Sequence, residues 1–216
     1  TMTFCPNNQL DDLPTRGVTI IGTLNTVLGD LSVRCKPPRF RVQNAEISPM
    51  RTMEINAEII HSDELAASIH LRQYDLTRLD DEDFVEIADS LCDYEYRLAQ
   101  AITDTWFVDD IAELGTLVDI TRIWAAPAYR GTDVMKTSLT WLLERFCANR
   151  ALTVAFPFPL QYEGNGNRNT AAIRAAVTKL RTYYANTYGM KPACAAGSEL
   201  TLFYTTSHDQ LSSFAR

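Results

Sequence analysis

The sequence predicts an α/β (α+β) fold with a mixed, mostly antiparallel central sheet flanked by helices. Residues 53–60 alternate partly between apolar and polar, and a turn signal at 62–64 joins them to a second apolar run at 65–74. This pattern is typical of an antiparallel hairpin. From residue 117 onward, β-like runs alternate with segments whose apolar residues recur at helical spacing. That order indicates strands covered by helices.

The secondary structure of the N-terminal part of the chain is less clear from the sequence. Residues 1–16 are polar and irregular and are expected to form a loosely held arm, whereas 17–31 fits either a strand and turn or a short helix. Cysteine, lysine and two prolines at 35–38 interrupt the chain, and 40–47 is a candidate strand. The run at 65–74 could also be helical, which leaves an alternative to the hairpin.

A long helix is predicted from about residue 81 to 106. Its apolar residues at helical spacing are Phe84, Ala88, Leu91, Leu98, Ile102 and Trp106. The four carboxylates at 80–83 are interpreted as complementing the positive N-terminal end of this helix. A metal site is the alternative, but the acidic run lacks the spaced pattern of a calcium loop.

The second half of the chain follows the order strand, helix, strand, helix, strand. The predicted strands are 117–126, 151–159 and 200–205, and the helices cover about 135–146 and 169–188. Asn169 is a plausible N-cap and Gly189 a plausible C-cap of the last helix. Residues after Ser207 are expected to be frayed.

We therefore expect residues 1–39 to form an N-terminal arm with the first elements. Residues 40–206 would form the main domain, and 207–216 a C-terminal tail.

Length, composition and net charge restrict the classes of function that the chain can have. The chain has 216 residues, 46% of them hydrophobic, so it is long enough for one domain with a core. A net charge of −7 without a run of Lys or Arg argues against a nucleic-acid-binding surface. No apolar run reaches the ~18 residues that span a membrane, and the N-terminus lacks the basic start and apolar core of a signal peptide.

The cysteines and histidines suggest neither a metal site nor a disulfide framework. The five cysteines are widely spaced and odd in number, and the three histidines show no ligand spacing. A reducing cytoplasm is the simplest location. Cys92 and Cys147 are interpreted as small core residues on helices.

The most informative stretch is 117–146, where an apolar strand ends in a Pro and an Arg-Gly turn just before a helix. Backbone N–H groups at a helix start are unpaired and carry part of the positive end of the helix dipole. Such a turn is therefore suited to bind an anion.

This stretch resembles the acyl-CoA-binding segment of the GNAT superfamily of N-acetyltransferases, roughly V-x-P-x-Y-R-G-x-G-x-G/A. The matching residues are Ala125, Pro127, Tyr129, Arg130 and Gly131. Asp133 and Met135 replace two later glycines that let the family's backbone approach the pyrophosphate. Asp133 would either cap the helix or modify the phosphate site, where Arg130 and Lys136 could offset its charge.

The resemblance, which covers roughly residues 117–205, implies the following roles. Acyl-CoA would be held by Ile123, Trp124, Ala125, Arg130, Gly131, Thr132, Asp133, Val134, Met135 and Lys136. Asp119, the only carboxylate of the strand, would be the base, although a salt bridge to Arg122 or another basic side chain also explains it. Strand alternation would place Asp119 on the same face as Thr121 and Ile123.

Tyr184 would be the acid that protonates the leaving thiolate, with Tyr183 and Tyr188 as rivals and a core aromatic role as the alternative. Residues 156–162, rich in aromatic residues and prolines, would line the acceptor side or contact another protein.

The expected function is transfer of an acetyl group from acetyl-CoA to a primary amine of a small molecule or protein, by direct attack and without a metal. No cysteine sits in a motif for a nucleophile. One alternative is a GNAT-like module that binds acyl-CoA or a protein without catalysis. Another is an unrelated α/β interaction protein. The acceptor, the acyl length and the oligomeric state, a homodimer included, stay open.

Overall fold

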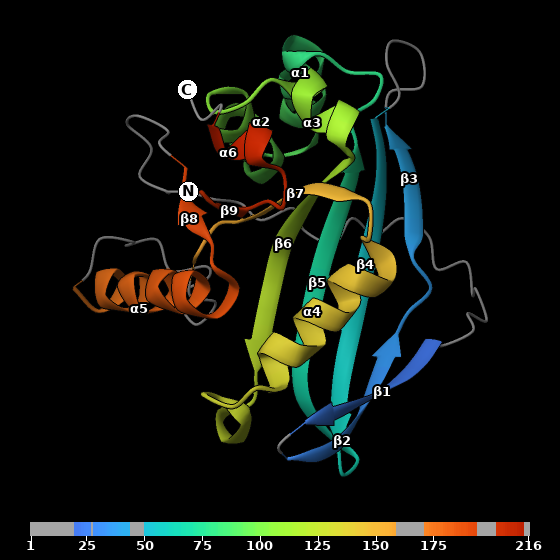
Figure 1. Cartoon of the computed structure of the whole chain (residues 1–216), viewed down its shortest axis with the longest axis vertical. Coiled ribbons are helices and arrows are strands. Elements are labelled where there is room, and N and C mark those ends of the chain that lie inside the picture. The colour runs from blue at the N-terminus through green and yellow to red at the C-terminus, as the bar shows by residue number, and fades with distance from the viewer. Residues whose placement is uncertain (1–19, 27, 44–49, 159–170, 194–201, 214–216) are drawn as a thin grey trace.

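In a computed structural model of the chain, the described residues are 20–26, 28–43, 50–158, 171–193 and 202–213. Their strands form one mixed sheet in the order β1-β2-β4-β5-β6-β7-β9-β8, with β3 paired to β4 (Figure 1). The strands are β1 (Ile20–Thr26), β2 (Gly29–Cys35), β3 (Arg39–Gln43), β4 (Met50–His61), β5 (Glu64–Asp75), β6 (Thr116–Ala125), β7 (Arg150–Ala155), β8 (Lys191–Pro192) and β9 (Phe203–Thr205).

Within these residues, only β6 and β7 pair in parallel. The predicted class, with a mostly antiparallel sheet flanked by helices, is confirmed.

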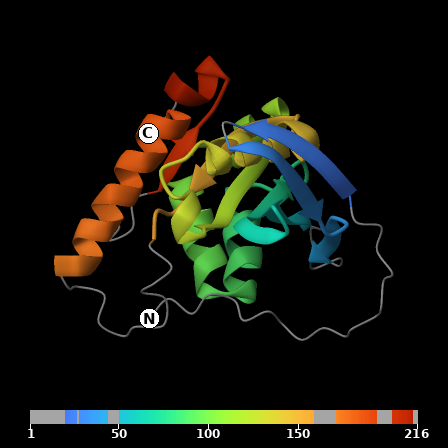
Figure 2. The same ribbon diagram turned by 90° about the horizontal axis from the view of Figure 1, so that it is seen from below.

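Helices cover both faces of the sheet. They are α1 (Asp81–Leu91), α2 (Asp93–Thr103), α3 (Val108–Leu114), the short 3-10 helix η1 (Pro127–Tyr129), α4 (Val134–Phe146), α5 (Ala171–Tyr188) and α6 (Asp209–Ser213). Figure 2 shows α1–α3, in green, on the side of the sheet opposite to α4, in yellow. Each side has its own core of buried side chains. Strand alternation divides the strands between the two, as when Leu117 enters the α1–α3 core and Val118 the α4 core.

The predicted hairpin is confirmed, and the helical alternative for 65–74 is wrong. β4 and β5 pair antiparallel along their length, and two residues connect them. These residues, Ser62 and Asp63, have φ values of 50° and 66°, the backbone region that a tight hairpin turn requires. In the described part of 17–31, β1 and β2 also form a strand and turn rather than a short helix.

The single long helix predicted for 81–106 is wrong. The chain forms α1 and α2, separated at Cys92, whose backbone is extended with φ −173° and ψ 164°. Helical spacing of apolar residues continues through this break because both helices cover the same core. Cys92 is disulfide-bonded, which corrects the expectation of cysteines without disulfides, whereas Cys35 and Cys147 are free and buried.

The role predicted for the acidic run is confirmed. Asp80 is the N-cap of α1, where its Oδ1 accepts a hydrogen bond of 2.8 Å from the Asp83 N–H, and the other three carboxylates lie in the first turn. Asp81 in addition accepts the backbone N–H of Val108, at the start of α3, at 2.8 Å. The run therefore satisfies amides at two helix starts.

The C-terminal elements agree in part. α5 ends at Tyr188, and the next residue, Gly189, has a φ of 65°, which confirms the predicted C-cap. Asn169 and the loop at 162–168 lie outside the described residues. Residues 209–213 form α6 instead of a frayed end, with Leu211 fully buried. No described helix combines the length and apolar character needed to cross a membrane.

Candidate functional site

The site forms where the two parallel strands separate. β6 pairs with β7 only from Thr116 to Asp119, although β6 continues to Ala125. On its other side, β6 stays paired with β5 as far as Ala125. In the described chain, the edge of β6 that faces β7 is thus without a strand partner beyond Asp119. An open strand edge presents N–H and C=O groups to which an extended ligand can bind.

A bulge follows directly after the point of separation. The β5–β6 register pairs Leu71 with Ile120 and His70 with Arg122, so Thr121 is the extra residue. The Thr121 hydroxyl donates a hydrogen bond of 3.0 Å to the His70 carbonyl. Because the bulge shifts the alternation by one residue, Ile123 packs against the α4 core, whereas Asp119 faces α2. The prediction that Asp119 and Ile123 share a face is therefore wrong.

Asp119 is fully buried at the separation point. The Tyr94 hydroxyl on α2 donates a hydrogen bond of 2.7 Å to its Oδ2, and its Oδ1 has no hydrogen-bond partner among the described residues. Burial raises the pKa of Asp119 to about 7, although the Tyr94 hydrogen bond and the positive charge of Arg72 lower it. A carboxyl group whose pKa is near neutral can exchange a proton at physiological pH.

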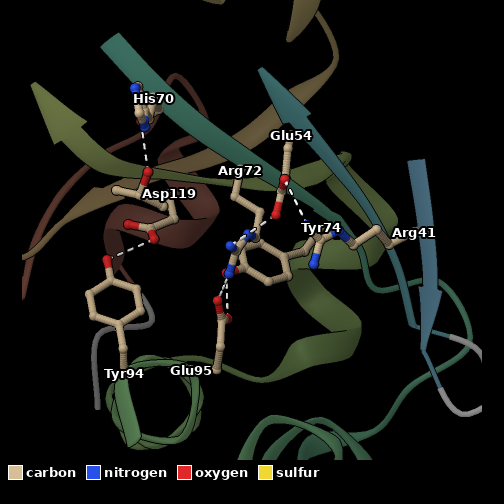
Figure 3. Close-up of polar contacts among 9 residues, drawn as sticks. Arg41, Glu54, His70, Arg72, Tyr74, Tyr94, Glu95 and Asp119 are labelled. Carbon is tan, nitrogen blue, oxygen red and sulfur yellow. Dashed lines mark hydrogen bonds and ion pairs between the residues drawn. The ribbon is translucent and has the colours of Figure 1, made fainter. Parts of the chain in front are cut away.

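Asp119 belongs to a larger polar network on the α2 side of the sheet (Figure 3). Glu54, Arg72 and Asp119 lie opposite one another on β4, β5 and β6. Arg72 forms ion pairs with Glu54, at 3.1 Å, and with Glu95 of α2, a side chain that is 2% exposed. The Tyr74 hydroxyl donates to Glu95 Oε2 at 2.6 Å.

Arg41 extends the network at its outer end, where it pairs with Glu54 at 3.3 Å. Apart from Asp119, sequence reasoning missed these residues. The available signal was a charged residue at an inward position of each hairpin strand, Glu54 and Arg72, since such charges are expected to pair.

Tyr184 lies on α5, is 3% exposed and packs in the α4 core. Burial raises its pKa, with further contributions from Tyr183 and from the charge of Asp119. The predicted acid and base are therefore within electrostatic reach, although Asp119 hydrogen-bonds on the α2 side. The rivals Tyr183 and Tyr188 share a hydrogen bond of 3.2 Å between their hydroxyls.

The turn before α4, which is predicted to bind an anion, combines a glycine with positive φ and a helix start. Gly131 has φ 80°, and a Cβ built there would meet no atom within 4 Å, so open space adjoins the turn. The first backbone bond of α4 runs from Thr137 N–H to Asp133 O, at 2.8 Å. The amides of Met135 and Lys136 precede that bond and face the helix start by helix geometry. Lys136 is exposed beside them, whereas the side chains of Val134 and Met135 are buried.

Side chains tie this turn to the strands. Arg130 is exposed, and its Nε donates to the carbonyl of Ala125, at the end of β6, at 3.1 Å. Tyr129 and His61, at the tip of the β4–β5 hairpin, form a hydrogen bond of 3.0 Å. The Thr132 hydroxyl donates to Tyr129 O at 2.7 Å. The cap interpretation of Asp133 fails, because this residue occupies the N-cap position with αR backbone and makes no side-chain capping bond.

The other predicted residues are placed as follows. Ile123, Trp124 and Ala125 are half-buried at the end of β6. Of the stretch at 156–162, residues 156–158 are described, and Phe156 contacts the Tyr94 ring edge to face with centroids 5.8 Å apart. Among the described residues, no three His, Cys, Asp or Glu side chains gather as a metal site would need.

No protein-family model matches the sequence, and a search of curated proteins finds no match. Among solved structures, the chain is similar to the crystal structure of an agmatine N-acetyltransferase mutant in its apo form. Identity is 11%, the TM-score is 0.39, and the match covers 70% of this chain and 75% of that chain. A similarity of this size establishes neither a family nor an activity.

Proposed function

We propose that this protein is a GNAT-like N-acetyltransferase that transfers an acetyl group from acetyl-CoA to a primary amine by direct attack. One observation carries the proposal. A buried carboxyl group with a pKa of about 7, Asp119, lies where β6 and β7 separate. The same strand leads directly into a turn and helix start suited to a phosphate.

In this proposal the turn holds the diphosphate of the co-substrate. The amides of Met135 and Lys136, the Lys136 ammonium group and the Arg130 guanidinium group supply positive partners. Gly131 leaves space for close approach of the phosphate. Ile123, Trp124 and Ala125 offer the backbone edge along which the extended pantetheine arm would lie. Thr132, Asp133 and Val134 complete the turn.

Asp119 and Tyr184 act on protons in this proposal. Asp119 accepts a proton from the substrate ammonium, directly or through one water, which frees the nitrogen lone pair. The amine nitrogen then bonds to the acyl carbon as the carbon–sulfur bond breaks, and the nitrogen releases a second proton that replaces the one Tyr184 gives away. Tyr184 gives its proton to the departing thiolate. Its raised pKa keeps this hydroxyl protonated until that step.

A second candidate is a GNAT-like module that binds acyl-CoA without catalysis. Two observations favour it: Asp119 is fully buried, with Tyr94 bonded to one oxygen, and a negative residue, Asp133, stands at the start of α4. The amine acceptor, a cytoplasmic location and a homodimer remain predictions in both cases.

Calorimetric titration with acetyl-CoA tests the binding step. We expect wild-type binding and a loss of about 1–3 kcal/mol for Arg130→Ala, the range for a hydrogen bond to a charged group. Arg145→Ala is the matched control, because Arg145 is an exposed arginine in the last turn of α4, at the end of that helix far from Arg130. Equal affinity of the two variants would exclude the proposed diphosphate site.

Turnover separates the two candidates. Release of CoA thiol is measured with a panel of primary amines for wild type and for Asp119→Asn. If the protein is an enzyme, the wild type should release CoA thiol. Asp119→Asn should release none, although it should bind acetyl-CoA as tightly as the wild type does. Binding of acetyl-CoA by wild type without thiol release would favour the binding module instead.

A further inference from the structure

A groove lies far along β6 from the turn at Arg130, beside the first residues of that strand. It has a volume of about 570 Å³, within the range of small-molecule sites. Its walls come from β3, β4 and β5, from the C-terminal end of α3 and from the start of β6. We call it the Gln73 groove, after the polar residue at its inner wall.

Gln73 is the feature that points to a ligand. Its side chain is 8% exposed and lines the groove. Its Nε2 donates to Thr116 Oγ1, at 2.6 Å, and to Asn149 Oδ1, at 3.2 Å. Its Oε1 is buried and accepts no hydrogen bond from the described residues. A buried carbonyl oxygen without a donor costs about 1–3 kcal/mol, which a bound N–H or O–H group would recover.

The wall around this oxygen is fixed in place. Thr116 N–H donates to Asn149 O at 3.1 Å, and a Cβ at Gly115 would lie 2.0 Å from that same carbonyl. The two backbones are therefore in direct contact, which holds the partners of Gln73 in position. A site held by such contacts loses little entropy when a ligand binds.

The remaining walls indicate the charge and shape of the ligand. Two carboxylates, Asp75 and Glu113, line the groove against one arginine, Arg51. Thr77 donates to Asp75 Oδ1 from its hydroxyl, at 2.7 Å, and orients this carboxylate. Arg51 lies directly opposite Asp75 in the β4–β5 register and offsets its charge, which leaves the groove net negative. Phe40, 77% exposed, and Met53 add an apolar wall.

We propose that the Gln73 groove binds a small organic ammonium ion with an apolar portion, whose N–H group donates to Gln73 Oε1. The apolar portion lies against Phe40 and Met53, and the carboxylates favour the positive charge. This site is separate from the proposed acetyl-CoA site and does not depend on it.

The probe is 2-phenylethylammonium chloride, with the neutral 2-phenylethanol and the anionic phenylacetate as matched ligands. Titration calorimetry and NMR of the Gln73 side-chain amide measure binding to the full chain. We expect the ammonium ion to bind at millimolar concentration or below, and at least about tenfold more tightly than either analogue, a difference of ~1.4 kcal/mol. Its binding should shift the Gln73 amide resonances.

Two variants assign the contacts. Gln73→Met keeps the length of the side chain and should weaken binding about tenfold, while thermal unfolding reports whether the fold is kept. Glu113→Gln, at an exposed position, should weaken binding about twofold to fivefold, the range for an exposed charge pair. Gln100→Met, on the surface of α2, is the control and should bind as wild type does.

The proposal is overturned if the ammonium ion does not bind the wild type at millimolar concentration, or if phenylacetate binds equally well. Unchanged affinity in a folded Gln73→Met variant would also overturn it. If Gln73→Met does not fold, unchanged affinity in Glu113→Gln decides against the site. Acetyl-CoA affinity of these variants should equal that of wild type, so the result is independent of the proposed transferase activity.

Discussion

Asp119 shows how the position of one residue sets both a chemical property and a cost in stability. Its carboxyl group is fully buried, and its pKa is raised from 3.8 to about 7. The folded protein therefore binds this proton more tightly than the unfolded chain does. By linkage, the stabilisation from the proton is complete below about pH 4 and is lost as pH rises toward 7.

We expect the Asp119→Asn variant to remove this pH dependence. The wild type should lose stability relative to the variant as pH rises from about 4 to 7, by a few kcal/mol at most, because one unit of pKa shift corresponds to ~1.4 kcal/mol. Urea unfolding at several pH values measures the difference. Parallel stability curves for the two proteins would contradict the raised pKa.

At this scale the sequence singled out Asp119 as a candidate but did not predict its surroundings. Asp119 was recognisable as the only carboxylate of an apolar strand. Its hydrogen-bond donor, Tyr94, comes from another element, and nothing in the helical pattern around Tyr94 indicates which side chain it reaches. Contacts between elements depend on how the helices dock, which single-sequence patterns do not encode.

At the scale of elements, α2 is held to the sheet by charge as well as by apolar contacts. Replacing Arg72 by Met should leave Glu95 buried without its cation. We expect the free energy of unfolding to fall by about 3 kcal/mol. This is the lower end of the range for breaking a buried ion pair, because the Arg72 side chain is 23% exposed. Denaturant unfolding measures it.

Arg97→Met is the control for that experiment. Arg97 pairs with Asp93 within α2, but both side chains are more than one-third exposed, so the loss should stay below about 1 kcal/mol. If Arg72→Met lowers the free energy of unfolding no more than Arg97→Met does, the network adds little to the docking of α2.

The turn before α4 gives a second prediction at this scale. Gly131→Ala should destabilise the protein by about 1–2 kcal/mol, because its φ of 80° is unfavourable for a residue with a Cβ. Gly189→Ala, with φ 65° and similarly open surroundings, should cost a similar amount. Only Gly131→Ala should also weaken acetyl-CoA binding. Equal effects of both variants on acetyl-CoA affinity would argue against the turn as its site.

Element types were more predictable than their ends. The hairpin, β6 and α4 follow from local patterns of alternation and helical spacing. The break at Cys92 does not, because apolar spacing is the same whether one helix or two cover a core. The bulge at Thr121 could not be predicted from the sequence pattern either. The extra residue keeps the strand extended but changes which way the later side chains face.

At the scale of the whole molecule, two cores share one sheet, and the last helix closes the α1–α3 core. Leu211 of α6 is fully buried there, and its carbonyl accepts the indole N–H of Trp106 at 2.8 Å. Leu211→Ala should therefore destabilise the protein by about 2–5 kcal/mol. Thermal unfolding measures it, with the exposed Ser212→Ala as the control. A near-neutral Leu211→Ala would mean that the core does not need α6.

The extra residue at Thr121 has a consequence for how this strand can change. Deleting it would make β6 a regular strand that keeps the pairs Leu71–Ile120 and His70–Arg122, so the side chains from Arg122 to Ala125 would face as they do now and Ile123 would stay against the α4 core. A residue inserted at the same place would instead shift Arg122 to Ala125 by one position and exchange the faces of their side chains. We therefore expect β6 to tolerate the loss of Thr121 far better than the gain of one residue beside it.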